Sequence, residues 1–425
     1  MRNLEVYIEC NGNMINVGSI TGHNSEDAVF SYSEEYIEDK SSRAISISLP
    51  LDERSFSPER TRCFFESLLP EGYTRRCVAG WLHVDENDYI SVLSELGSEC
   101  LGAIRIVEGD MNITESSYRL LSHEELLEFA REGATKSAEL VIKSHLSLAG
   151  ASGKTGLYYD RNNNEWYQPA GLAPSTHILK QSHVRLKKIV ANEQLCLLTA
   201  RKLDSFIINL NDKENDFLFA TERYDRKILD TSKELMGKKV PLRLHQEDFA
   251  QALGITASQK YEKNGKDYLA DAFELIKNYS SNPIEDQIRL WDLCIFNYLI
   301  GNTDNHVKNI ALLYSEDLKG IRLAPAYDLL STVIYDSSTE KMSLNIDGEY
   351  DIRNINQKSF ENEAKKLGLG KGIAMQHFLS MVEKFEMALE QSTYELEEQG
   401  YGVAVDIQKQ ILKKAGIHNF KLTNS

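Results

Sequence analysis

The sequence contains no long apolar run. No stretch reaches the roughly 18 uncharged apolar residues that a transmembrane helix requires. The first residues, Met1 to Glu9, include acids where a secretory signal peptide needs an apolar core. We therefore expect a cytoplasmic protein that makes no use of a membrane.

Cysteine is sparse, and its spacing excludes familiar metal motifs. The six cysteines form no Cys-x-x-Cys pair, which fits a reducing compartment and argues against a zinc site. The ten histidines contain no His-x-x-x-His pair, and no Gly-x-Ser-x-Gly segment occurs. Zinc hydrolysis and Ser-His-Asp hydrolysis therefore have no support in the sequence.

The sequence has fewer basic than acidic residues. The chain has 48 Lys and Arg against 64 Asp and Glu, a net charge of −16. Such a protein has no general attraction for nucleic acid, so contact with DNA would need a local basic patch or a basic partner. The lysines at 365–371 and 409–414 are candidate patches, although a solvated helix face explains them more simply.

What remains is an ordinary globular composition, with 42% hydrophobic and 26% charged residues over 425 positions. That length predicts two or three domains. We expect an α+β protein with three parts: a β-rich module (1–108), a β-rich lobe (109–240) and an all-helical lobe (241–425). Alternation predicts strands over 4–8, 44–49, 176–180 and 217–224, and the turn signal Asn11-Gly12-Asn13 after the first of them predicts a hairpin. Helical periodicity marks 64–69, 75–82, 192–203, 374–398 and 403–415.

Two helix starts carry capping signals. Ser122 is followed three residues later by Glu125, and Asn282 is followed by Pro283 and then by Glu285. Both patterns predict a capping box at the beginning of a helix. The second helix should end at Gly301, because glycine accepts the left-handed conformation at a helix end.

A glycine-rich segment, Gly150 to Gly156, lies between two predicted strands. Closely spaced glycines allow backbone N–H groups to surround phosphate oxygens. The segment is not a standard P-loop, because that motif requires glycine where Leu148 stands. A plain glycine-rich hairpin also fits. Lys180, at the end of the next predicted strand, could hold phosphates or simply be a solvated strand end.

The segment after the Gly301 stop carries the strongest signal. Asp304 is followed five residues later by Asn309, the spacing of a kinase catalytic loop. In such loops the Asp accepts the proton of the substrate hydroxyl and the Asn holds Mg²⁺. Asp328 follows the next predicted strand, where a second magnesium-binding Asp belongs. The ordered set of glycine loop, lysine, Asp-x4-Asn and Asp predicts a kinase site.

Across nearly the whole chain, these residues resemble the HipA-type serine/threonine kinases, the toxin half of HipA–HipB toxin–antitoxin systems. The segments that carry the resemblance in the first domain are 46–51, 64–72 and 96–103. Those in the core are 147–151, 176–180, 192–193, 222–226, 243–249, 296–304, 306–309 and 324–328.

The resemblance implies a two-lobed protein-kinase-like fold and a set of roles. Asp304 would be the catalytic base, and Asn309 with Asp328 would hold Mg²⁺. Ser147 would be an autophosphorylation site that silences the enzyme, although an inward strand serine is the alternative. The residues expected to contact ATP are Ala149, Gly150, Ala151, Ser152, Gly153, Lys154, Lys180, Glu222, Tyr224, His306, Lys308, Asn309, Tyr327 and Asp328.

The resemblance also implies partners. The substrate would be a protein hydroxyl, with aminoacyl-tRNA synthetases and other translation proteins as the class to test. A basic, HipB-like helix-turn-helix antitoxin would complement the charge of −16 and bring DNA mainly through itself. Two other functions stay open: a catalytically weak corepressor that acts with the antitoxin, and a small-molecule phosphotransferase with the same core.

Overall fold

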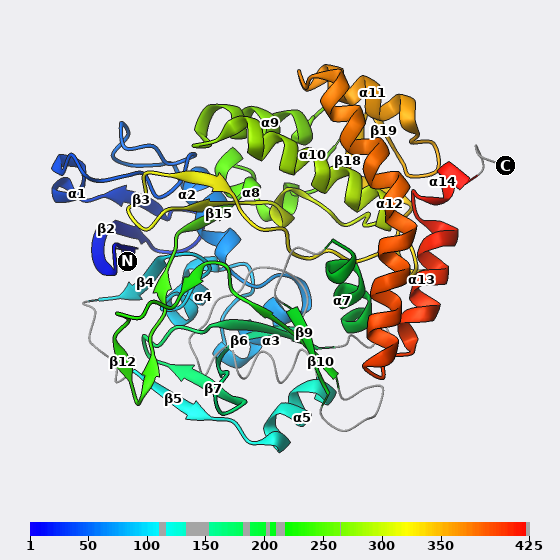
Figure 1. Cartoon of the computed structure of the whole chain (residues 1–425). Coiled ribbons are helices and arrows are strands. Elements are labelled where there is room, and N and C mark those ends of the chain that lie inside the picture. The colour runs from blue at the N-terminus through cyan, green and yellow to red at the C-terminus, as the bar shows by residue number, and fades with distance from the viewer. Residues whose placement is uncertain are drawn as a thin grey trace. The chain divides into compact units, whose positions relative to one another are not determined.

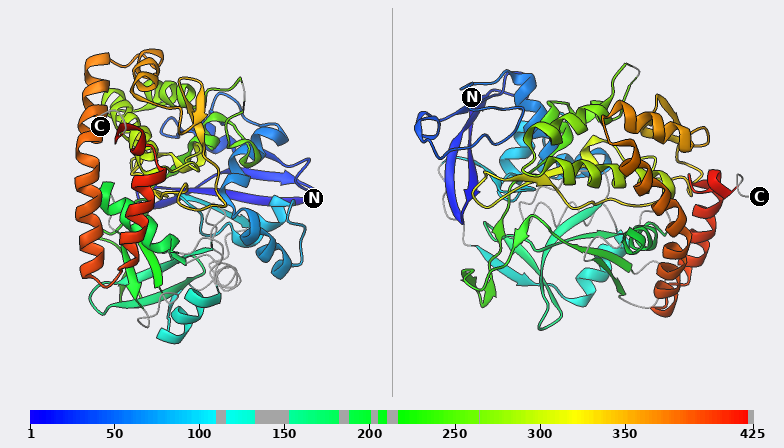
Figure 2. Two further views of the ribbon diagram at one scale, coloured as in Figure 1. Left: turned by 90° about the vertical axis from the view of Figure 1, so that its right-hand side faces the viewer. Right: turned by 45° about the horizontal axis from the view of Figure 1, so that its top comes forward.

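The structure is a computed structural model. It describes residues 1–109, 116–132, 153–181, 188–200, 205–209, 217–263 and 265–421, with the backbone alone for 205–209 and 421. The chain divides into two compact units (Figures 1 and 2). The first unit comprises Met1–His183, Ile208–Ala257 and Leu312–Ile321, and the second comprises Val184–Ile207, Ser258–Ala311 and Arg322–Ser425.

The first unit opens with a four-stranded sheet in the order β3-β2-β1-β4. Its strands are β1 (Arg2–Cys10), β2 (Asn13–Gly22), β3 (Val29–Tyr32) and β4 (Ile104–Glu108). Asn11 and Gly12 both have positive φ, as a two-residue hairpin turn requires, so the predicted first hairpin is confirmed. The helices that follow β3 are α1 (Glu34–Glu38), α2 (Pro58–Phe65), α3 (Gly72–Leu82) and α4 (Tyr89–Leu96).

The strand predicted over 44–49 is wrong. Residues 44–49 form turns with one isolated bridge, although the alternation of Ile45, Ile47 and Leu49 is typical of a strand. The Tyr32 hydroxyl accepts from the Ile45 N–H at 3.0 Å and donates to the Leu49 carbonyl at 2.6 Å, which folds the segment back. A buried tyrosine therefore takes the place of a neighbouring strand.

The same segment contacts an isolated buried acid, Glu247. Its carboxyl group accepts from the Ser46 hydroxyl at 2.5 Å, from the Ile47 N–H at 3.2 Å and from the Tyr314 hydroxyl. Burial raises the pKa of Glu247 to about 7, because these hydrogen bonds only partly offset the loss of water.

The second sheet of this unit has six strands in the order β5-β7-β6-β8-β10-β9. They are β5 (Ser117–Leu120), β6 (Lys154–Asp160), β7 (Glu165–Ala170), β8 (His177–Gln181), β9 (Ser205–Asn209) and β10 (Phe217–Glu222). Helix α5 (His123–Glu132) begins with the predicted capping box: Ser122 Oγ accepts from the Glu125 N–H, and Glu125 Oε2 accepts from the Ser122 N–H.

Short strands and one helix complete the region. Strand β11 (Arg226–Lys227) pairs with β14 (Leu242–Arg243), and β12 (Glu234–Leu235) pairs with β13 (Lys238–Lys239). A further sheet has the order β15-β16-β17, with β15 (Gln246–Asp248), β16 (Ala311–Tyr314) and β17 (Ile321–Leu323). Helix α8 spans Phe249–Leu253.

A buried ionic cluster joins the N-terminal module to the segment after β10. Glu99 is fully buried and lies within 3.3 Å of Arg223 and 2.9 Å of Arg226, and it also pairs with Arg243. Asp225 pairs with Arg223 at 2.7 Å. Burial alone would raise the pKa of Glu99, but the three guanidinium groups outweigh that effect and hold it far below its ordinary range.

The second unit is mainly helical, as predicted for the C-terminal lobe. Its helices are α7 (Ile189–Ala200), α9 (Tyr268–Tyr279), α10 (Pro283–Ile300), α11 (Gln357–Lys366), α12 (Lys371–Glu398), α13 (Val403–Lys414) and α14 (His418–Lys421). It is not purely helical, because β18 (Lys341–Ile346) and β19 (Glu349–Asp351) form a hairpin. Asp347 and Gly348 supply the two positive φ angles of its turn. No helix in the part of the chain that the structure describes is long and apolar enough to span a bilayer.

Helix α10 is the central element of this unit (Figure 1). Trp291 and Tyr298 on α10 pack against Phe360 of α11, with ring centroids 5.7 and 5.2 Å away. The helix starts at Pro283 as predicted, but the Asn282 side chain does not cap the backbone; it donates to Glu285 Oε2 at 2.5 Å. The predicted stop is confirmed, since Gly301 has a φ of 71°.

Candidate functional site

A polar loop leaves α10 at Gly301, and the buried amide of Asn302 organises it. Asn302 Nδ2 donates to Asn297 Oδ1 at 2.8 Å and to the Asp328 carbonyl at 3.1 Å. The oxygen of the same amide accepts from the Asp304 N–H at 3.2 Å. One side chain therefore fixes the backbone at both acidic residues singled out in the sequence.

Asp304 is exposed while the residues around it are buried. The Tyr261 hydroxyl donates to Asp304 Oδ1 at 2.8 Å, and Asn309 Nδ2 donates to the Asp304 carbonyl at 3.0 Å. The fixed backbone thus presents this carboxylate at the surface, within reach of a substrate group.

Asp328 has a φ of 51°, a left-handed conformation that few residues other than glycine adopt. Its side chain is half-buried. The preceding residue, Tyr327, donates its hydroxyl to the Lys308 carbonyl at 2.8 Å. Such a conformation persists only where its surroundings hold it, and here Asn302 and Tyr327 do so on either side.

Hydroxyl groups fasten the rest of the loop. Thr332 Oγ1 accepts from the Thr303 N–H at 2.7 Å and donates to the Gly301 carbonyl at 3.1 Å. Ser343, on β18, donates its hydroxyl to the Thr303 carbonyl at 2.6 Å. The groups that make these contacts are neutral hydroxyls, backbone N–H groups and carbonyls.

Helix α7 contributes a second amide clamp. Asn192 Nδ2 donates to the Ser331 carbonyl at 2.8 Å, and Asn192 Oδ1 accepts from the Ser331 N–H at 3.1 Å. The sequence interpretation gave no anchoring role to Asn192 or Asn302, although both lie in segments that it singled out. For Asn192, the signals in the sequence were a polar residue within an apolar helix pattern and its place in the 192–193 segment of the family resemblance.

The two predicted magnesium ligands offer hard oxygen atoms. The Asn309 amide nitrogen is hydrogen-bonded, which leaves its oxygen to face a cation, and Asp328 adds one carboxylate. The described residues include no group of three His, Cys, Asp or Glu side chains that could hold a metal. The pair fits Mg²⁺, which commonly uses one or two carboxylates and completes its shell with phosphate and water.

His306 and Lys308, which the sequence places near phosphate, are both buried. The His306 ring meets the Tyr261 ring edge to face at 5.2 Å. Tyr261 therefore contacts both Asp304 and His306. The sequence interpretation did not identify this tyrosine.

In the first unit, two of the predicted ATP-contacting lysines are cross-strand partners. Lys154 on β6 is paired with Lys180 on β8, and Phe219 on β10 is also opposite Lys180. The Lys180 Nζ lies 5.6 Å from the Phe219 ring centroid. Directly opposite residues project from the same face, and like charges so placed repel.

The glycine segment differs in part from its prediction. Lys154 to Gly156 belong to β6 instead of the loop, and Gly153 immediately precedes the strand. Ser147 and Ala149 to Ser152 lie outside the described residues. Glu222 ends β10, with its carboxylate 2.7 Å from Arg161, and Tyr224 donates its hydroxyl to Gln246.

Comparison with known proteins finds two families that match successive parts of the chain. The family described as the HipA N-terminal domain matches residues 8–107, and the HipA-like C-terminal domain matches residues 146–390. The protein Y4mE of Sinorhizobium fredii is 31% identical over 378 residues, covering 86% of this chain and 87% of its own length.

Two further comparisons come from Shewanella oneidensis. Its serine/threonine-protein kinase toxin HipA is 26% identical over 358 residues, which cover 81% of this chain and 80% of the toxin. A chain in the solved complex of its toxin–antitoxin system HipA, HipB and operator DNA matches with a TM-score of 0.78 at 22% identity, over 96% of both chains.

The fold is thus α+β, with a β-rich N-terminal part and a helical C-terminal part, as predicted. The chain belongs to the HipA family, since a HipA N-terminal domain precedes a HipA-like C-terminal domain that covers more than half of its length.

Proposed function

We propose that this protein is a serine/threonine protein kinase that uses ATP and Mg²⁺ and acts as the growth-inhibiting toxin of a type II toxin–antitoxin system. The observation that carries the proposal is the Asn302 amide, which binds the backbone of both Asp304 and Asp328, two acids that are 24 positions apart in the chain. A loop that served only to reverse the chain would not need a side chain that fixes the backbone of two acidic residues.

The described residues support distinct roles in one transfer. Asp304 is exposed and would accept the proton of a substrate hydroxyl. The oxygen of that hydroxyl would attack the γ-phosphorus of ATP, and the bond between the γ-phosphorus and ADP would break. Asn309 and Asp328 would hold Mg²⁺, which neutralises phosphate charge when bound. Lys154 and Lys180 would bind phosphate oxygens from the face of the sheet that they share.

The experiment is phosphoryl transfer from labelled ATP with Mg²⁺, followed by mass spectrometry of the purified chain. We expect phosphate on Ser147 in the wild type and a loss of about 10²–10⁴-fold in Asp304→Asn, the range for removing a general base. Asp336→Asn is the matched control, because Asp336 is an exposed acid of the same unit. Unchanged transfer in Asp304→Asn would contradict the assigned role.

The same experiment separates the alternatives. The relatives include a kinase toxin and a HipA–HipB–DNA complex, which supports a HipB-like antitoxin partner and DNA contact through that partner. A protein that binds such an antitoxin and its operator but transfers no phosphate to itself or to lysate proteins would be a corepressor. A translation protein labelled in lysate by the wild type alone would identify the substrate class.

A further inference from the structure

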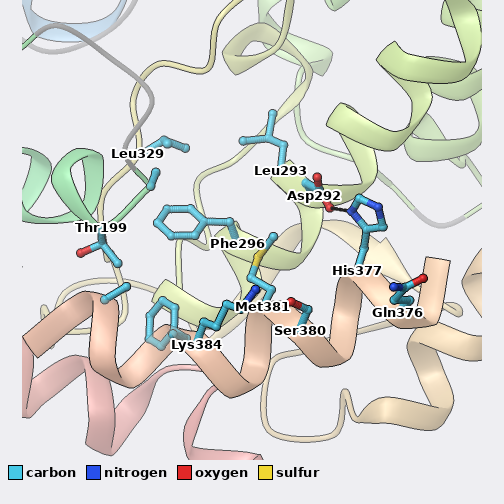
Figure 3. A pocket seen from close by; sticks show the side chains of 13 residues that line it. Thr199, Asp292, Leu293, Phe296, Leu329, Gln376, His377, Ser380, Met381 and Lys384 are labelled. Atoms are coloured by element: carbon cyan, nitrogen blue, oxygen red, sulfur yellow. Dashed lines mark hydrogen bonds and ion pairs between the residues drawn. The ribbon is translucent and has the colours of Figure 1, made fainter. Parts of the chain in front are cut away.

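A cavity of about 400 Å³ lies within the second unit, apart from the polar loop residues described above. Residues of three helices and one loop residue line it (Figure 3). Thr199 comes from the end of α7, Phe296 from α10 and His377 from α12, and Leu329 comes from the segment after β17. Its volume is in the range of sites that bind small organic molecules.

The lining combines an apolar centre with a few polar groups. Phe296 lies at the middle of Figure 3, and the Phe385 ring is 6.2 Å from it between centroids. Met381 adds a flexible, polarisable side chain that adapts to different shapes. An aromatic or branched hydrocarbon group would replace water against these side chains.

The charges at the cavity differ in their accessibility to a ligand. His377 Nδ1 donates to Asp292 Oδ1 at 2.9 Å, so that carboxylate already has a hydrogen-bond donor. Lys384 is exposed, and no ion pair joins it to any residue that the structure describes. A ligand with one anionic group would therefore find its counter-charge at Lys384.

The cavity also touches the segment that carries a candidate magnesium ligand. Leu329 is buried in its wall and directly follows Asp328. Two residues further, Ser331 is clamped by Asn192 of α7, the helix whose last turn supplies Thr199. A ligand in the cavity would therefore contact this segment at Leu329 and the helix that clamps it, α7, at Thr199.

We propose that the cavity binds a small organic anion with an aromatic or branched apolar body, and that its occupancy stabilises the Asp328–Val333 segment. Both parts of this proposal, ligand binding and stabilisation of the segment, rest on the cavity lining and on the hydrogen bonds of the segment. The further consequence, control of phosphoryl transfer through Asp328, rests on the proposed function.

The test uses anilinonaphthalene sulfonate, an aromatic anion whose fluorescence rises in apolar sites, with the full-length protein. Ala388→Phe should fill the cavity and Lys384→Glu should reverse its charge, and each should weaken binding by about tenfold or more. Met387→Phe, at an exposed position of α12, and Lys409→Glu, at an exposed position of α13, are the matched controls and should leave the dissociation constant unchanged.

Hydrogen exchange provides a readout that needs no enzymatic activity. The amides of Ser331, Thr332 and Val333 donate to Asn192 Oδ1 and to the Gly301 carbonyl, and they should exchange more slowly when the probe is bound. The slowing should disappear in Ala388→Phe.

Equal affinity in the wild type and both cavity variants, or no binding at all, would overturn the proposed site. Binding that depends on Ala388 and Lys384 but leaves the exchange of these amides unchanged would overturn the coupling. An inactive kinase that still shows both effects would refute the proposed function and leave the cavity proposal standing.

Discussion

The ionic cluster of the first unit and the polar loop of the second unit are held together in different ways. The first unit buries full charges: Glu99 is surrounded by Arg223, Arg226 and Arg243. In the polar loop of the second unit, buried neutral side chains such as Asn192, Asn302 and Thr303 make the hydrogen bonds that hold the backbone, although Lys308 is buried there as well. The acids there, Asp304 and Asp328, stay at least partly exposed.

This difference indicates that charged side chains have different roles in the two regions. A charge enclosed by opposite charges has little freedom to act, because removing any partner leaves an uncompensated ion. A neutral amide can fix a backbone and leave nearby carboxylates available for protons or metals. We infer that the first unit uses charge for structure, whereas the polar loop reserves charge for chemistry.

The largest expected change in stability comes from removing the Glu99 carboxylate from the ionic cluster. Glu99→Ala should destabilise the first unit by about 3–5 kcal/mol, because three buried guanidinium groups would face one another with Asp225 and Glu9 as the close acids that remain. Denaturant unfolding would measure the loss. Glu34→Ala, which breaks an exposed pair with Arg54, is the control and should cost no more than about 1 kcal/mol. Similar losses in the two variants would remove the distinction drawn above.

The next effect concerns Glu247, a buried acid of the first unit whose near neighbours are hydroxyls, Asp248 and an N–H instead of a cation. The native carboxyl keeps its proton up to a pKa of about 7, whereas the unfolded one releases it near 4.5. Native Glu247 therefore binds more protons between these values, and its contribution makes stability fall as pH rises from 4.5 through 7.

Glu247→Gln should abolish this contribution, about 3 kcal/mol by linkage, while its amide still donates to Ser46 and accepts from Ile47. Thermal unfolding of both proteins at pH 5 and pH 8 would measure it as a difference. Subtracting the two proteins cancels His245, whose pKa burial lowers to about 4 and whose effect has the opposite sign. Parallel pH profiles would show that Glu247 is ionised in the native protein.

The smallest expected change in stability comes from the amide at the candidate site. Asn302→Ala should cost about 1–3 kcal/mol, because it leaves the Asp304 N–H and the Asp328 carbonyl without this partner. Phosphoryl transfer should fall by more than stability does, since both acids lose their fixed backbone. Asn362→Ala, an exposed amide of the same unit, is the control. An Asn302→Ala protein with full transfer would contradict the positioning role.

Much of the architecture could be predicted from local signals. Helix α10 was predicted from Pro283 and Gly301, and the Asn11–Gly12 hairpin from its turn residues. These succeed because the conformational preference lies in the residues themselves. The strand over 44–49 failed because Tyr32, distant in sequence, satisfies its backbone instead of a neighbouring strand.

The candidate site shows the same limit. The spacing of Asp304, Asn309 and Asp328 was enough to propose chemistry, but the residues that hold them were not evident. Asn302, Asn192 and Tyr261 act through partners that lie 26, 139 and 43 positions away. No periodicity or turn rule encodes contacts at such separations.

The linear order of residues determined the family, the helix ends and the identity of the acids, because each depends on residue type and short spacing. Tertiary structure decided which charges are enclosed by partners and which remain exposed. It placed Lys154 opposite Lys180, tied Asp304 to Asp328 through one amide and left a cavity beside Leu329. Burial and hydrogen bonding between distant segments arise only when the chain has packed, and they set how each charged group behaves.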